Sequence, residues 1–194
     1  MLRSFTFLAA LALLVGCEKQ GTQMDGPDVT TPGGTVIDES ADTDPITAVA
    51  NLEQVGASGV TGTLNFVQDG DTVTITGEVS GLTPGLHGFH VHESGDLSDK
   101  EAGMSVGGHF NPTNHPHGHA HDSERHAGDL GNIEANAEGI ATINITDKVI
   151  RLAGEHPIVG KAMVVHADED KFTQPTGDAG GRVAFGVVEL KDAE

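Results

Sequence analysis

The chain has 194 residues, and its 29 Asp and Glu outnumber its 10 Lys and Arg, which gives a formal net charge of −19. Such an acidic chain repels the phosphate backbone of nucleic acids, so we exclude nucleic acid as a partner. Cys17 is the only cysteine, which excludes a disulfide within the chain. The folded part must therefore be stabilised by packing and by any metal that it binds.

The N-terminal sequence has the pattern of an export signal. A short basic start at residues 1–3 precedes an apolar run at residues 5–15. This run is too short for a transmembrane helix, which needs about 20 residues. It ends in LVGC at residues 14–17, which resembles the lipobox of bacterial lipoproteins, where the cysteine is lipidated and becomes the first mature residue. We predict a signal peptide over residues 1–16 and lipidation of Cys17; an ordinary secretory peptide is the alternative.

The residues after Cys17 predict a tether to a membrane. Residues 18–44 are rich in Gly, Pro, Thr, Asp and Glu and contain almost no large apolar side chains. Such a segment cannot bury enough surface to offset the entropy of ordering it. We predict a flexible tether over residues 17–44 and a lipid-anchored protein in the periplasm or at the cell surface. Glu18 stands where some inner-membrane lipoproteins have aspartate, which favours the outer membrane.

Residues 45–194 have the length of one domain of ordinary size. In residues 72–79 the apolar side chains occupy every second position except at Gly77, which is typical of a strand with one face in solvent. No segment has a sustained helical period. We predict an all-β antiparallel sandwich or flattened barrel. The expected strands are 48–54, 60–68, 72–79, 87–92, 139–146, 161–166 and 182–190.

Histidines gather in two parts of this domain. His90 and His92 lie one residue apart in an expected strand, so they share a face about 7 Å apart while Phe89 and Val91 point to the other face. Residues 103–129 read as one long loop, and loops of this length are usually functional or disordered. The loop brings five histidines and an aspartate within reach of one ion, and this donor set suits Zn²⁺. These residues are His115, His117, His119, His121, His126 and Asp129.

Five motifs run through the domain in a fixed order. They are GLHGFHVHE at 85–93, GHFNP at 108–112, RHAGDLGN at 125–132, VVH at 164–166 and GDAGGR at 177–182. In order and spacing they resemble the copper/zinc superoxide dismutases, and the resemblance extends over about residues 48–190. It implies an eight-stranded Greek-key barrel with long metal-binding and electrostatic loops.

The resemblance also implies one copper and one zinc ion per subunit. The copper ligands would be His90, His92, His109 and His166, and the zinc ligands would be His109, His117, His126 and Asp129. His109 would bind both metals. His117 is assigned because its separation from His109 matches the family, and no role follows for His115, His119 or His121.

The implied activity is the dismutation of superoxide to dioxygen and hydrogen peroxide, as an antioxidant defence outside the cytoplasm. His109 and Arg182 would be the catalytic residues, the first donating a proton and the second binding the superoxide anion. The domain has 22 Asp and Glu against 8 Lys and Arg, with Lys171 as the other cation expected nearby, so we expect weak electrostatic steering. A non-catalytic metal carrier and a purely structural sandwich domain are the alternatives.

The resemblance also has implications for the residues around the metals. Asp170 would orient one copper and one zinc ligand, with Asp168 and Glu169 as competitors, and Thr176 would line the channel. The disulfide common in the family is missing, since Met104 and Phe185 stand in its places. We expect these two side chains to pack against each other in its stead. A homodimer is possible, although the loss of this disulfide puts it in doubt.

Overall fold

The computed structural model describes residues 45–192. The expected signal peptide, the lipidation site Cys17 and the tether lie outside the described residues. Among residues 45–192, no helix is long and apolar enough to cross a membrane.

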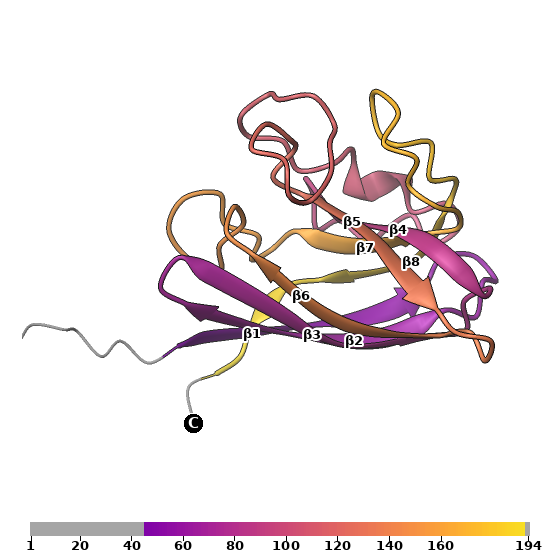
Figure 1. The fold of residues 1–194 in the computed structure, drawn as a ribbon. Helices are drawn as coiled ribbons and strands as arrows, with labels where there is room; N and C mark the ends of the chain where they lie inside the picture. Colours follow the sequence, from indigo (N-terminus) through magenta and orange to yellow (C-terminus); the bar gives the residue numbers. More distant parts are fainter. Residues whose placement is uncertain (1–44, 193–194) are drawn as a thin grey trace, which may run out of the picture. The chain divides into compact units, whose positions relative to one another are not determined.

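The described residues form an antiparallel barrel, as expected. The strand order is β5-β4-β7-β8-β1-β2-β3-β6, and the short β9 pairs with β1. Figure 1 shows β1, β2, β3 and β6 as one layer and β4, β5, β7 and β8 as the other; β5 contacts β6, which brings the ends of the sheet together. The strands are β1 Ile46–Gln54, β2 Thr61–Asp69, β3 Thr72–Ser80, β4 Gly85–His92, β5 Asp129–Ala135, β6 Ile140–Asp147, β7 Ala162–His166, β8 Arg182–Val187 and β9 Glu189–Leu190.

The two layers enclose an apolar core. Phe66 from β2, Ile75 from β3, and Phe89 from β4 are fully buried in it. The alternation in β3 breaks at Gly77 because a Cβ there would lie 2.1 Å from the carbonyl oxygen of Thr63. The same close approach excludes any larger residue at this position.

Two strand predictions need correction. We did not predict β5, Asp129–Ala135, because its first three residues are all buried and it shows no clean alternation of apolar and polar residues. The expected strand 182–190 is two strands, β8 and β9, with Val188 between them. β8 pairs with β7 on one side and with the end of β1 on the other, whereas β9 pairs with the earlier part of β1, at Ala48 and Val49.

The expected packing of Met104 on Phe185 is wrong. Met104 begins a short 3-10 turn, Met104–Val106, and its side chain is 64% exposed. Phe185 is buried in a second apolar cluster that includes Val106, and a Cβ added at Gly103 would lie 3.3 Å from the Phe185 ring. The turn directs Val106 inward and Met104 outward, so Val106 and Gly103 fill the space that we had assigned to Met104.

Candidate metal centre

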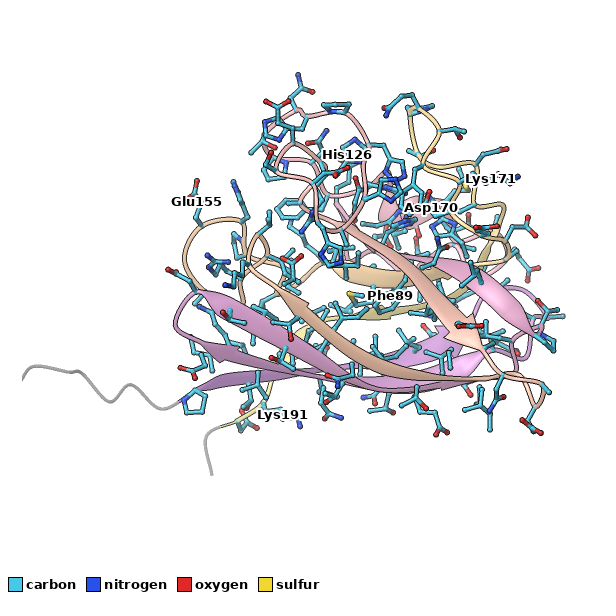
Figure 2. The ribbon with its side chains drawn as sticks, in the orientation of Figure 1. Phe89, His126, Glu155, Asp170, Lys171 and Lys191 are labelled. Carbon is cyan, nitrogen blue, oxygen red and sulfur yellow. The ribbon has the colours of Figure 1, made fainter. Side chains whose placement is uncertain are left out.

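β4 and β7 carry three of the expected histidines on the outer face of their layer. Phe89 pairs with Val165 and His90 with Val164, so the end of β7 brings His166 beside β4. Figure 2 shows Phe89 between the two layers, with His126 and Asp170 on the opposite side of the upper layer. One face of β4 therefore packs in the core while the other faces the long loops, which explains why every residue from His87 to His92 is buried.

Hydrogen bonds to β4 fix the position of His109. The N–H of Phe110 donates to Val91 O at 2.8 Å, and the N–H of Val91 donates to Gly128 O at 2.9 Å. A Cβ at Gly128 would lie 2.2 Å from Val91 O, so this position requires glycine. The loop of residues 103–129, called the His-rich loop below, is thus bound to β4 both at Phe110 and at Gly128.

The first donor group consists of His90, His92, His109 and His166, all buried, with one nitrogen of each within 4.8 Å of the others. The Nδ1–H groups of His92 and His166 donate to backbone carbonyls of Gly107 and Gly180, at 2.9 and 3.3 Å. Their Nε2 atoms therefore both carry lone pairs, yet they lie only 3.3 Å apart. Two lone pairs at this distance repel each other unless a proton or a metal cation lies between them, and nitrogens that bind one metal ion lie about this far apart.

His90 completes this group in the same way. Its Nε2–H donates to Asp170 Oδ2 at 2.8 Å, and its buried Nδ1 has no hydrogen-bond partner. A buried nitrogen without a partner costs free energy unless it binds a ligand. The donor set, all imidazole nitrogen, suits Cu²⁺.

The second donor group consists of His109, His117, His126 and Asp129. Asp129 Oδ1 lies 2.9 Å from His109 Nδ1 and from His117 Nδ1, and 3.2 Å from His126 Nδ1. Ligands bound about 2.0 to 2.1 Å from a tetrahedral zinc ion lie roughly 3.3 Å apart, so these separations are close to those of a zinc cage. The Nδ1 atoms of His117 and His126 make no hydrogen bond, which again fits a metal ligand.

The carboxylate of Asp129 is fixed by the backbone. The N–H groups of Gly118 and His126 donate to Asp129 Oδ2 at 3.1 and 3.0 Å, which leaves Oδ1 facing the three imidazoles. The burial of Asp129 raises its pKa, but the hydrogen bond with His109 and the adjacent imidazole of His117 outweigh burial and hold that pKa well below its usual value. Asp129 is thus ionised, as a metal ligand must be.

Asp170 connects the two groups. Its Oδ2 accepts from His90 and its Oδ1 accepts from His117 Nε2 at 3.0 Å. The side-chain amide of Asn132 pairs with the backbone of Asp170, at 2.8 and 3.0 Å. Asp168 and Glu169, which the sequence left as competitors, are exposed.

The pKa values of the histidines reflect burial and their partners. Burial lowers the pKa of His90 to about 4 and that of His166 to about 3, so both rings are neutral at pH 7. Burial also lowers the pKa of His117, but the adjacent carboxylates of Asp129 and Asp170 outweigh burial and raise this pKa to about 9. Without metal, His117 is therefore protonated at pH 7, and a metal ion bound at its Nδ1 would have to displace a proton.

Arg182 lies beside the first donor group at a cavity of about 560 Å³. Its Nη1–H groups donate to Gly103 O at 2.8 Å and to Met104 Sδ at 2.9 Å. The cavity is lined by His92, Glu101, Ala102, Met104, Gly108, His109, His166, Thr176, Asp178, Ala179, Gly180, Gly181 and Arg182. Lys171, which we expected near the channel, is not among these residues; its Nζ lies 3.4 Å from Asp178 Oδ2.

Sequence reasoning missed three supporting residues. Gln174 pairs through its amide with the backbone of His117, at 3.0 and 2.7 Å, and Asn132 holds Asp170 as described. Arg125 is buried, donates to the carbonyls of His126 and Ala127, and forms an ion pair with Asp147. The RHAGD motif contains Arg125, but its partner is 22 residues away and nothing in the sequence marks it.

A family model described as copper/zinc superoxide dismutase (SODC) matches residues 60–188. The chain belongs to the copper/zinc superoxide dismutase family. It is 47% identical over 154 residues to an "Extracellular superoxide dismutase [Cu-Zn]" from Brugia pahangi, an alignment that covers 74% of this chain and 76% of the relative. As a copper/zinc superoxide dismutase, the protein uses copper and zinc to convert superoxide to dioxygen and hydrogen peroxide. The two alternatives from the sequence, a non-catalytic metal carrier and a purely structural sandwich domain, are therefore set aside.

Proposed function

We propose that copper is bound by His90, His92, His109 and His166, and zinc by His109, His117, His126 and Asp129. The observation that carries the proposal is that two groups of buried donors overlap at one imidazole, that of His109. The unpartnered nitrogens of His90, His117 and His126 support it, because each belongs to one of these groups.

In this arrangement His109 has two roles. Its Nδ1 faces Asp129, which leaves Nε2 for the copper group. Bound copper supplies the one-electron redox chemistry of the reaction, while zinc supplies charge and a fixed attachment. His109 Nε2 would bind copper and a proton in turn: when it does not bind copper, it holds a proton that it can donate to the departing peroxide. The ring, held through Nδ1, keeps its orientation meanwhile.

Arg182 is proposed to bind the incoming superoxide anion, and Thr176 to line its path. The guanidinium is half-buried at the cavity, and carbonyl oxygens of the loop that contains Gly103 and Gly107 hold it in place. A permanent planar cation fixed in this way attracts and orients a small anion without a change in protonation.

The His109→Ala variant tests the shared ligand. We expect loss of dismutase activity together with weaker zinc retention, measured by metal analysis after dialysis against a chelator. His115→Ala is the matched control, since His115 lies in the same loop but in neither donor group of the described residues, and it should keep both properties. If His109→Ala lost copper but held zinc as tightly as the native protein, the shared ligand would be wrong.

We further propose that the protein is exported and attached to lipid through Cys17, with residues 1–16 as signal peptide, 17–44 as tether and 45–194 as enzyme domain. The printed name of the Brugia pahangi relative, an extracellular enzyme, supports export. Membrane fractionation of cells that express the native chain and the Cys17→Ser variant tests attachment. We expect only the native chain in the membrane fraction; equal release of both chains would contradict lipidation.

A further inference from the structure

Met104 lies at the active-site cavity with most of its side chain exposed. The side chain is 64% exposed and lines the same cavity as His109, His166 and Arg182. Its Sδ accepts a hydrogen bond from Arg182 Nη1 at 2.9 Å. Met163, the other methionine of residues 45–192, is fully buried in β7.

The enzyme's own product is an oxidant that reaches Met104. Hydrogen peroxide formed beside His109 and His166 must leave through the cavity that Met104 lines. Thioethers are oxidised by peroxide, and exposure decides which methionine reacts first. We propose that Met104 is a site of oxidation by peroxide, and that its sulfoxide slows the enzyme by binding Arg182.

The chemistry is balanced with no further reagent. A lone pair of Met104 Sδ attacks one peroxide oxygen, the O–O bond breaks, and an S–O bond forms. The sulfur loses two electrons, and the second oxygen, which departs as hydroxide, takes the proton of the transferred oxygen and leaves as water. One thioether and one H₂O₂ thus give one sulfoxide and one H₂O.

The effect on rate depends on the proposed anion-binding role of Arg182. A thioether sulfur is a weak acceptor, whereas a sulfoxide oxygen is strongly polar and accepts hydrogen bonds readily. Since Nη1 already contacts this side chain, the new oxygen competes with superoxide for the same donor. We expect the rate constant to fall about two- to fivefold, which corresponds to roughly 0.4 to 1 kcal/mol.

The test treats the copper- and zinc-loaded protein with increasing peroxide and follows each methionine by mass spectrometry. Trypsin places Met104 and Met163 on separate peptides, 101–125 and 162–171. We expect the first peptide to gain one oxygen before the second does, with fragment ions locating it on Met104. Methionine sulfoxide reductase should remove that oxygen and restore the rate constant measured before treatment.

Two variants complete the experiment. Met104→Leu should resist the reversible loss of rate, whereas Met163→Leu should show it as the native protein does. Oxidation of Met163 before Met104, an unchanged rate after full oxidation of Met104, or the same reversible loss in Met104→Leu would each overturn the inference.

Arg182→Gln separates this inference from the proposed function. If Arg182→Gln loses rate but peroxide leaves Met104 of the native protein unoxidised, only the proposed modification is refuted. A variant that keeps the native rate would refute the anion site, and the expected effect of the sulfoxide would fall with it.

Discussion

Asp170 contacts one histidine of each proposed metal group, so a single carboxylate orients both. It binds His90 through one oxygen and His117 through the other, and it is fully buried. In Asp170→Asn one of these oxygens becomes an NH₂ group, which cannot accept. We expect the affinity for at least one metal to fall about 10- to 100-fold, as is usual when such a partner of a metal-bound histidine is lost.

Competition with a chelator, followed by metal analysis, measures this change. Glu169→Gln is the matched control, because Glu169 is the exposed neighbour of Asp170 in the same loop. Equal copper and zinc affinities in Asp170→Asn and the native protein would show that the carboxylate does not orient the ligands.

The sequence predicted the histidines more fully than the residues that support them. His90, His92, His109 and His166 stand in compact motifs, and the structure brings them within reach of one another. Their supports cannot be recognised in the same way. Asn132 and Gln174 act on backbone groups 38 and 57 residues away, and an amide side chain carries no sequence pattern that names such a partner.

At the scale of the elements, Arg125 attaches the His-rich loop to β6. Its ion pair with Asp147 is buried on both sides, and Asp147 Oδ1 also accepts from two backbone N–H groups after β6. Asp147→Ala leaves an uncompensated buried charge. We expect the free energy of unfolding of the metal-free protein to fall by about 3 to 5 kcal/mol.

Denaturation in urea measures this loss, with Asp71→Ala as control. Asp71 pairs with Arg151 but is 94% exposed, so its removal should change stability little. Similar small losses in both variants would mean that the Arg125–Asp147 pair does not hold the loop in place.

The strands were predictable from the sequence where buried and exposed residues alternate, and not where consecutive residues are all buried. β3 alternates along nearly its whole length, and its register with β2 follows from that pattern. The first three residues of β5 are all buried, and the first of them, Asp129, belongs to a motif that we had assigned to a loop. The sequence pattern therefore suggested the barrel but not the strand that carries Asp129, a proposed zinc ligand.

At the scale of the whole domain, its negative charge opposes a negative substrate. Arg182 shares the cavity with Glu101 and Asp178, and Lys171 lies near Asp178. We predict a modest salt dependence, with the rate constant for superoxide decay falling less than about tenfold between low and physiological ionic strength. Stopped-flow decay measurements over this range test it. A steep fall would reveal strong steering, and a rise with salt would mean that repulsion prevails.

The buried histidines make the metal-free protein sensitive to acid. In the folded protein the pKa values of His90 and His166 are about 4 and 3, below the ordinary 6.5. Between these values and pH 6.5 the unfolded chain therefore binds more protons than the folded protein does. Stability should therefore decrease as the pH falls from 6.5, by up to about 1.4 kcal/mol per pH unit for each ring. His117, with its pKa raised to about 9, acts oppositely, and its contribution is lost as the pH rises from 6.5 to 9.

Urea denaturation of the metal-free protein between pH 4 and 9 tests both directions, and we expect the greatest stability near pH 6.5 to 7. Stability that stayed level or rose from pH 6.5 down to pH 4 would show that these rings are not buried as neutral groups.

The most direct test of the shared imidazole is a crystal structure of the fully reconstituted protein, with anomalous scattering recorded at the copper and zinc edges. We predict copper on the His109 Nε2 side, among His90, His92 and His166, and zinc on the Nδ1 side, beside Asp129. A His109 ring bound to one ion alone, or a copper group that stays empty under full reconstitution, would contradict the proposed centre.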